Sequence, residues 1–197
     1  MKTNIVHLIL CLLSTACIAT AAEPQSLFDG KTLKGWHTNP ERGCWSVKDG
    51  CIVGEEDAEK LGSYLETDKE YKDFTFECEA RWNDVADSGF MFRKEQRIHV
   101  NIGMSPSMKR DMTASLYLIK AGGYVAEAKV ATLLKPREWN KFKIELQGKK
   151  LTVWFNGEKV IEHEQGKFME AGPIGLQCHK ETPGLKIEFR NLRVMEQ

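Results

Sequence analysis

Polar side chains suited to acid–base chemistry alternate with apolar ones in several short segments of the sequence. Residues 74–82 and 98–102 both repeat with a period of two, which sends successive side chains to opposite faces of a β-strand. Glu79 and Arg81 therefore share one polar face, and His99 and Asn101 share another. Histidine and carboxylate groups can exchange protons, and arginine can stabilise an oxyanion. The spacing predicts a site built on strand faces.

Further polar or aromatic side chains have the same outward parity on other segments. They are Arg93, Tyr117, Trp154, Gln177 and His179. Planar polar groups that bind hydroxyls, together with aromatic rings, are typical of a sugar-binding site. On a curved sheet we expect these side chains to converge on the concave side. The expected patch holds Glu79, Arg93, His99 and His179, with Trp154 or Tyr117 lining it.

The predicted catalytic residues are Glu79, His99 and His179. Two imidazoles and a carboxylate also suit a divalent cation acting as a Lewis acid, so the same three residues are candidate metal ligands. The predicted substrate-binding residues are Arg81, Arg93, Asn101, Tyr117, Trp154 and Gln177. The alternative for each histidine is a hydrogen-bonded surface residue.

Short β-prone segments separated by turn dipeptides make up the chain after residue 22. Asp49-Gly50 and Asn156-Gly157 each stand between two β-prone runs, and these dipeptides tolerate the positive φ of tight hairpin turns. Helical periodicity is almost absent, and no repeat or linker divides the chain. We expect one all-β domain over residues 23–197, an antiparallel β-sandwich, with a closed barrel as the alternative.

The N-terminal residues have the composition of an export signal. An apolar run follows Lys2 and ends at Leu13, and small residues come next. The run is too short to span a bilayer as a permanent helix. We expect residues 1–22 to be a signal peptide and the mature protein to be periplasmic or secreted, without a transmembrane segment. Residues 14–17 also resemble a loose lipobox, which makes lipoprotein anchoring at Cys17 the alternative.

Size and charge exclude several classes of protein. The 197 residues are 42% hydrophobic and 28% charged, which suits one domain with a proper core. The formal net charge of zero gives no basic field for nucleic acid, and we expect a monomer or a weak homo-oligomer. No Cys-x-x-Cys occurs, and we expect four buried free thiols in the mature chain. They are Cys44, Cys51, Cys78 and Cys178.

Seven segments in chain order resemble the motifs of the 3-keto-disaccharide hydrolase family, also described as 3-keto-glucoside 1,2-lyase/3-keto-2-hydroxy-glucal hydratase domains. They are residues 27–36, 73–81, 88–93, 138–140, 155–157, 172–177 and 189–193. The resemblance implies a concanavalin A-like jelly roll, bacterial export and glycoside substrates oxidised at C3. It also implies site roles for Glu79, Arg81, Arg93, Tyr117, Gln177 and His179. This chain has Asp87 where the family often shows Asn, and His99-Val-Asn101 where it often shows Glu-Val-Gln.

The implied substrates define a reaction. A keto group at C3 acidifies the proton at C2, so a base can remove that proton and the C1 substituent can then leave. Addition of water completes a net hydrolysis. We therefore predict an enzyme that cleaves 3-keto-glycosides, with a small carbohydrate as its partner. The alternatives are a classical glycosidase that uses two carboxylates such as Glu77 and Glu79, and a non-catalytic carbohydrate-binding module on the same fold.

Overall fold

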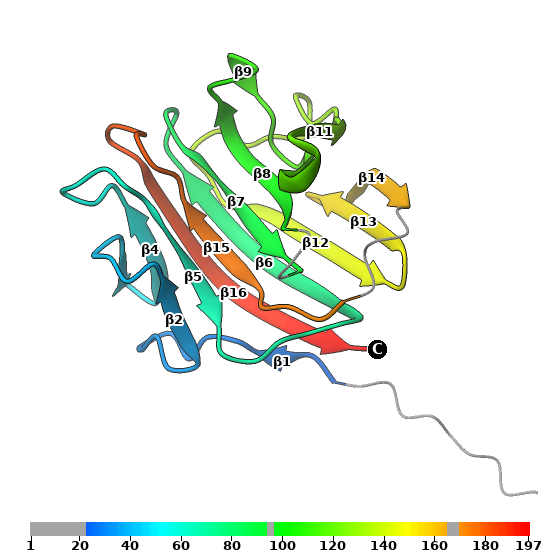
Figure 1. Ribbon diagram of the computed structural model, residues 1–197, viewed down its shortest axis with the longest axis horizontal. Helices are drawn as coiled ribbons and strands as arrows, with labels where there is room; N and C mark the ends of the chain where they lie inside the picture. Colours follow the sequence, from blue (N-terminus) through cyan, green and yellow to red (C-terminus); the bar gives the residue numbers. More distant parts are fainter. Residues whose placement is uncertain (1–22, 94–96, 165–169) are drawn as a thin grey trace, which may run out of the picture.

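The computed structural model describes residues 23–93, 97–164 and 170–197, which form two antiparallel sheets packed face to face (Figure 1). The predicted all-β fold and antiparallel sandwich are confirmed, and the closed barrel is wrong because the strands form two separate sheets. The predicted signal peptide, residues 1–22 with Cys17, lies outside the described residues. Among the described residues, no helix has the length and apolarity needed to cross a membrane.

We name the two sheets after their central strands. The β6 sheet has the order β14 (Glu158–Glu164), β13 (Lys150–Phe155), β12 (Asn140–Gln147), β6 (Phe74–Trp82), β16 (Lys186–Glu196), β4 (Cys51–Glu55) and β3 (Trp45–Lys48), with β1 (Gln25–Ser26) paired to β16. The β7 sheet has the order β11 (Gly123–Ala126), β10 (Leu116–Leu118), β8 (Ile98–Ser105), β7 (Asp87–Phe92), β15 (Gly175–Cys178), β5 (Ser63–Thr67) and β2 (Trp36–Asn39), with β9 (Arg110–Asp111) paired to β8. A 3₁₀ turn, Ile119–Ala121, follows β10.

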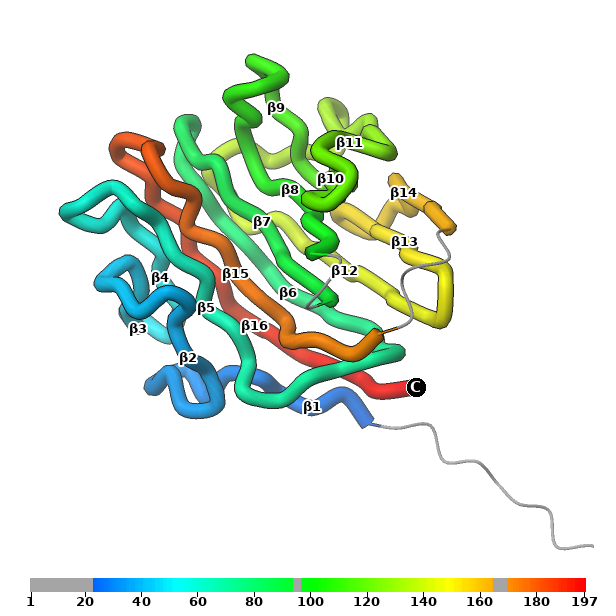
Figure 2. The backbone as a smooth tube through the Cα atoms, viewed as in Figure 1, coloured from blue at the N-terminus to red at the C-terminus, as the bar shows by residue number. Residues whose placement is uncertain are grey.

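The chain crosses from one sheet to the other several times, as the tube in Figure 2 shows. Strand β6 lies between β5 and β7 in the sequence, yet both neighbours belong to the opposite sheet. In the same way β15 and β16 follow one another along the chain and lie in different sheets. These crossings place segments that are far apart in the sequence side by side, so a site on either sheet draws on several parts of the chain.

Alternation along β6 and β7 builds the core between the sheets. Phe90 on β7 meets Phe76 on β6 with ring centroids 5.3 Å apart, and it also contacts Phe142 and Phe189 at 5.1 and 5.9 Å. All four rings are buried, and edge-to-face contacts of this kind add to the free energy of their burial. The side chains that alternate with them, including Glu79 and Arg81, point outward.

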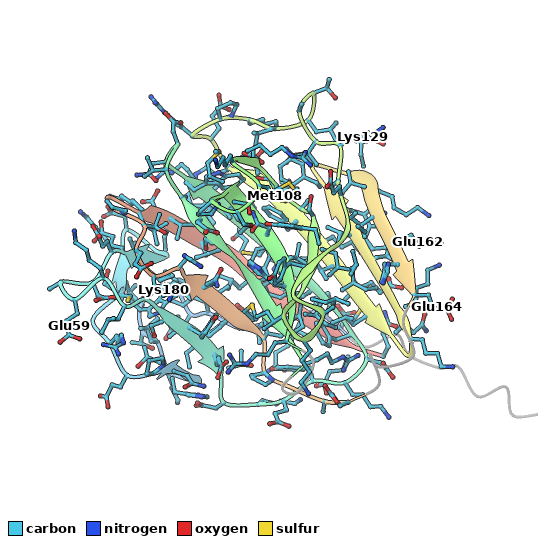
Figure 3. All side chains as sticks on the ribbon, turned by 45° about the horizontal axis from the view of Figure 1, so that its top comes forward. Glu59, Met108, Lys129, Glu162, Glu164 and Lys180 are labelled. Carbon is cyan, nitrogen blue, oxygen red and sulfur yellow. The ribbon has the colours of Figure 1, made fainter. Side chains whose placement is uncertain are left out.

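Two predicted hairpin turns are present. Asp49 and Gly50 join β3 to β4 with φ of 51° and 74°, and Asn156 and Gly157 join β13 to β14 with φ of 49° and 94°. Positive φ at both central residues matches the twist of the flanking strands. Strand β14 ends its sheet, and Figure 3 shows Glu162 and Glu164 projecting from it. Charged side chains of this kind protect an edge strand from pairing with another chain.

The four cysteines of the described chain are buried free thiols. Burial raises the pKa of Cys44 to about 11, and it also raises the pKa of Cys78 and Cys178 well above the usual range. Because the thiolate is the reactive form, these side chains behave as small apolar residues of the core. The four buried free thiols that we expected are found.

Candidate functional site

The register of the β7 sheet aligns its outward side chains in two rows that run across the strands. One row consists of Asn39, Tyr64, Gln177, Gly89 and Asn101. The other consists of His37, Glu66, Gly175, Met91, His99, Tyr117 and Tyr124. Gly89 and Gly175 carry no side chain in the middle of these rows, so larger neighbours can lean over them.

The histidine hollow lies on this face and has a volume of ≈ 470 Å³. We define it by His99, His179, Asp87, Gln177 and Tyr117, all of which line it. Five of the residues predicted from the sequence therefore lie together, namely His99, Asn101, Tyr117, Gln177 and His179. The expectation that the two histidines share a face is confirmed.

His99 is a neutral imidazole in this site. Burial lowers its pKa to about 4, although a hydrogen bond to the carbonyl of Ser88 acts in the opposite direction. Its Nε2 lies 3.2 Å from that carbonyl oxygen, which can only accept, so Nε2 carries the proton and Nδ1 carries the lone pair. The ring lies over Gly89, because a Cβ built there would stand 2.0 Å from Nε2. His99 therefore offers an acceptor and no positive charge.

Asp87 and His179 lie next to one another in the hollow. The carboxyl of Asp87 is 5% exposed, and burial raises its pKa from 3.8 to about 6, partly offset by His179. His179 Nδ1 lies 3.4 Å from Asp87 Oδ2 and donates to the carbonyl of Lys180 at 2.7 Å. Nε2 of His179 is therefore the ring atom left for a ligand. A carboxyl whose pKa lies near neutral in a cleft is a good acid–base candidate.

Amide and phenol groups complete the hollow. Oε1 of Gln177 is buried and accepts no hydrogen bond from the described residues, while its Nε2 lies 3.5 Å from the hydroxyl of Tyr64. A buried acceptor without a donor is costly, so a ligand hydroxyl here would be favoured. Asn101 is different. It is 1% exposed, accepts from Tyr124 at 3.1 Å and donates to the carbonyl of Gly103 at 3.0 Å. We conclude that the Asn101 side chain stabilises the wall of the hollow and does not bind the ligand.

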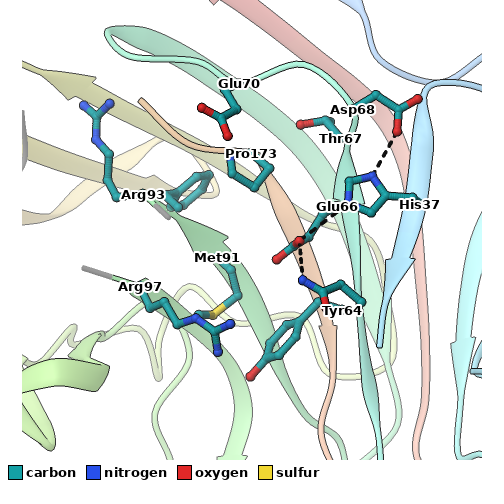
Figure 4. A pocket seen from close by; sticks show the side chains of 12 residues that line it. His37, Tyr64, Glu66, Thr67, Asp68, Glu70, Met91, Arg93, Arg97 and Pro173 are labelled. Atoms are coloured by element: carbon teal, nitrogen blue, oxygen red, sulfur yellow. Dashed lines mark hydrogen bonds and ion pairs between the residues drawn. The ribbon is translucent and has the colours of Figure 1, made fainter. Parts of the chain in front are cut away.

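A second, acidic hollow of ≈ 320 Å³ adjoins the first through their shared residue Tyr64 (Figure 4). We define it by His37, Glu66, Asp68, Asn39 and Arg97. His37 Nδ1 lies 2.9 Å from Asp68, and Glu66 accepts from Asn39 at 2.9 Å. Four strand spacings of about 4.8 Å separate His37 from His99, so roughly 19 Å lie between their backbones. The two hollows cannot act on one bond, but one extended ligand can occupy both.

Three predicted site residues lie on the opposite outer face. Glu79, Arg81 and Trp154 belong to β6 and β13 of the β6 sheet, so the core separates them from the histidines. The single patch that we expected is therefore wrong. Parity gives the side of a strand but does not say which sheet the strand joins. On that face Glu79 accepts from Arg190 at 2.7 Å, and Arg81 donates to Glu188 at 2.6 Å. Glu79 and Arg81 are thus engaged in ion pairs.

Arg93 is a structural residue rather than a member of the histidine hollow. It has a φ of 62°, and its buried guanidinium donates to the backbone carbonyls of Tyr71 and Glu170 and lies 3.7 Å from Asp73. Figure 4 shows the guanidinium pointing away from the His37 cluster. The patch prediction is wrong for this residue also, because its left-handed backbone turns the side chain into the seam between the sheets.

The predicted metal ligands do not come together. Glu79 lies across the sandwich from His99 and His179. Within residues 23–93, 97–164 and 170–197, no group of three or more His, Cys, Asp or Glu side chains has the geometry to hold a metal ion. The set of Glu79, His99 and His179 therefore does not fit a divalent cation.

Sequence reasoning missed Tyr64, Asp87 and Tyr124. Tyr64 alternates with the buried Leu65, and Asp87 has the parity of Gly89 and Met91, so periodicity was a sufficient signal for both. Tyr124 follows Gly122 and Gly123, which interrupt the β-prone pattern. The structure makes this segment the short edge strand β11, with a register shift against β10.

The fold and the hollow define a class. Two antiparallel sheets packed face to face, here with a hollow of histidine, carboxyl, amide and phenol groups on one outer face, form a galectin-like jelly roll. The chain belongs to one family in that class, described as the 3-keto-alpha-glucoside-1,2-lyase-like domain, whose model matches residues 23–195. The family suggested by the sequence motifs is confirmed. No curated protein matches the sequence.

Solved structures agree on the fold. A proposed glycosyl hydrolase from Parabacteroides distasonis is 21% identical, with a TM-score of 0.68 over 89% of this chain and 100% of that one. The carbohydrate-binding module CBM66 from Bacillus subtilis is 18% identical, with a TM-score of 0.63 over 82% and 96% of the two chains. A Bacillus subtilis protein with a galectin-like fold is 13% identical, with a TM-score of 0.65 over 83% and 90%.

Glu79 gives a test of this placement. Because its carboxylate lies on the β6 sheet and is held by Arg190, Glu79→Gln is expected to change the kcat/KM of any reaction in the histidine hollow by less than about twofold. The loss of a half-exposed ion pair is expected to lower the free energy of unfolding by about 1 kcal/mol or less. Steady-state kinetics and urea unfolding measure the two effects. A hundredfold fall in kcat would contradict this placement and would indicate that Glu79 takes part in catalysis.

Proposed function

We propose that this protein cleaves 3-keto-glycosides in the histidine hollow, by 1,2-elimination and hydration that begin with removal of the C2 proton. The observation that carries the proposal is the buried Asp87 carboxyl, with a pKa of about 6, beside His179. Family membership supports the substrate class. The proposed place of action is the periplasm or the cell exterior, as the N-terminal segment suggests.

Each group of the hollow has a part in this proposal. The carboxylate of Asp87 takes the C2 proton to give an enediolate, and the bond between C1 and its oxygen then breaks to give a 3-keto-2-hydroxy-glucal. His179 lies beside Asp87 with its Nδ1–H bonded to the carbonyl of Lys180, and as an imidazolium it gives the proton on Nε2 to the departing oxygen. Gln177 accepts a sugar hydroxyl at Oε1, and the neutral Nδ1 of His99 accepts another. Water then adds at C1 and gives a proton back to Nε2 of His179, while Asp87 returns its proton to C2.

The neighbouring acidic hollow suits the rest of the substrate. It begins at Tyr64, where the histidine hollow ends, and it offers Glu66, Asn39 and His37 as hydrogen-bonding groups. In this orientation the C1 substituent points from Asp87 towards β2. Dependence of turnover on a divalent cation stays a prediction, which is tested by measuring turnover with and without the cation.

The test is a paired assay with a glucoside and its 3-keto derivative, each with and without a divalent cation. We expect turnover of the oxidised substrate alone, together with exchange of its C2 hydrogen in deuterium oxide, because elimination must break that C–H bond. Turnover of the plain glucoside would instead favour a two-carboxylate glycosidase. Binding of either sugar without turnover would indicate that the protein is a non-catalytic carbohydrate-binding module. Turnover without C2 exchange would rule out proton abstraction.

A further inference from the structure

The outer face of the β6 sheet carries its own hollow, of ≈ 630 Å³. We name it the tryptophan hollow and define it by Trp154, Glu77, Lys141, Lys143, Asn191 and Arg193. It lies on the sheet opposite the histidine hollow, with the core between them. None of its residues lines the histidine hollow or the acidic hollow. Any ligand bound here is bound independently of the proposed reaction.

A break in strand pairing creates the hollow. The register of β16 against β6 shifts between Arg190 and Arg193, and Asn191 within the shift has a left-handed backbone with φ of 54°. An extra residue of this kind bends a strand and spreads the sheet locally. The depression reaches down to Cys78 and Phe142, whose side chains belong to the core but which line the hollow. The site is thus a concavity built into the sheet.

Positive charge exceeds negative charge around the hollow. Lys141, Lys143 and Arg193 line it together with the carboxylates of Glu77 and Glu79. Arg190 engages Glu79 at 2.7 Å from outside the hollow. The acidic hollow of the other sheet has the carboxylates of Glu66, Asp68 and Glu70 in its lining. The acidic hollow also has Arg93 and Arg97 in its lining, and they offset part of its negative charge. An anionic ligand is therefore favoured in the tryptophan hollow, where positive charge is in excess.

In this hollow a lysine ammonium lies over an aromatic ring. Lys143 Nζ lies 4.9 Å from the ring centroid of the half-buried Trp154. A sugar acid presents a face of C–H groups, which an indole ring can cover, and a carboxylate, which an adjacent ammonium can pair with. The amide of Asn191 adds a partner for hydroxyls. A neutral sugar would use the ring but leave the positive charge unpaired.

We propose that the tryptophan hollow is a second, non-catalytic site that binds an acidic carbohydrate: the sugar ring takes the place of Lys143 over Trp154, and Lys143 turns aside to pair with the carboxylate. The site would hold the protein on a uronate-containing oligosaccharide while the histidine hollow is free to turn over a separate substrate.

The test is a calorimetric titration of the full mature protein with trigalacturonate, maltotriose and inorganic sulfate. We expect trigalacturonate to bind at least tenfold more tightly than maltotriose, and more weakly as salt is raised. Trp154→Ala and Lys143→Gln are each expected to weaken this binding about tenfold, as for central residues of an interface. Both variants should keep turnover of a small 3-keto-glycoside, because neither residue lies in the histidine hollow.

The controls separate the alternatives. Lys48→Gln removes the same charge from β3 at the far edge of the same sheet and should leave trigalacturonate binding unchanged. Trp154→Phe keeps a ring and should retain most of the binding if Trp154→Ala fails to fold. Equal binding of maltotriose, full competition by sulfate, or no binding at all would overturn the proposal. So would loss of binding in Asp87→Asn with full binding in Trp154→Ala.

Discussion

Replacing Asp87 with asparagine is expected to abolish turnover and, at neutral pH, to stabilise the protein. The variant keeps the shape of the side chain but removes the proposed base, so kcat on a 3-keto-glycoside should fall by about 10³-fold. In the wild type, kcat/KM should rise as the pH increases through about 6, because the carboxylate form of Asp87 is the active one. Binding of the substrate should survive in the variant, which distinguishes a lost base from a lost site.

Asp87→Asn should lower turnover but raise the free energy of unfolding at neutral pH. The pKa of Asp87 is about 6 in the folded protein and 3.8 in the reference state, so the folded state binds this proton more tightly. Its favourable contribution is complete below about pH 4 and is lost as the pH rises to 6, a change of roughly 2–3 kcal/mol. The asparagine side chain has no charge to bury, and Asp87→Asn should therefore unfold at higher temperature than the wild type at pH 7.5.

Thermal unfolding at two pH values tests this linkage. The gain of Asp87→Asn should disappear at pH 4, where the carboxyl of Asp87 is largely protonated in the folded protein. His179→Ala is the matched control, since it leaves the carboxyl buried and removes the neighbour that offsets its burial. A variant that loses stability at pH 7.5, or one that retains turnover, would contradict the assignment of Asp87 as a buried base.

Gly89→Ala is expected to damage both the site and the sheet. The new Cβ would stand 2.0 Å from His99 Nε2 and 2.5 Å from the carbonyl oxygen of Val100. The imidazole must leave Gly89 and lose its hydrogen bond to Ser88, and the carbonyl cannot retreat without disturbing the pairing of β7 with β8. We expect a loss of about 2–4 kcal/mol in the free energy of unfolding, and at least a tenfold fall in kcat/KM.

Gly175→Ala is the matched control on the neighbouring strand. Its Cβ would meet Met91 Cβ at 3.1 Å and Glu66 Cγ at 3.5 Å, which a shift of a few tenths of an ångström relieves. We expect a cost of about 1 kcal/mol or less. The double variant Gly89→Ala/His99→Ala separates the ring from the backbone, because it recovers stability only if the imidazole caused the damage. Urea unfolding of the wild type and these three variants supplies the comparison, and equal losses at Gly89 and Gly175 would refute this account.

The sequence predicted strands and their faces well because alternation is a local property. Phe74, Phe76 and Cys78 are buried as their parity required, and both dipeptide turns have the predicted positive φ. Local pattern also grouped His99 with Asn101 and Gln177 with His179. It could not assign those strands to sheets, because pairing between distant segments decides that assignment. Glu79 was therefore placed with the histidines, although β6 pairs with β12 and β16 rather than with β7.

The sequence could not predict chemical properties that depend on the burial of a side chain. Nothing in the residues around Asp87 indicated that its carboxyl would be 5% exposed, since that follows from neighbours on β8 and after β15. The same holds for Arg93, whose left-handed backbone directs the guanidinium to carbonyls of Tyr71 and Glu170. A pattern of side chains identifies the groups that are available, and tertiary packing decides their ionisation and direction.

The aromatic layer around Phe90 has a consequence for redesign of this protein. Sheets in a sandwich pack about 10 Å apart, a separation at which the energetic effects of two substitutions usually add. Phe90 and Phe76 fill that space, so a library built on the outer face of one sheet should leave the other face unaltered. An engineer could exchange the residues that select a ligand on the β6 sheet while keeping the opposite hollow intact, and combine the best variants of each without screening every pair.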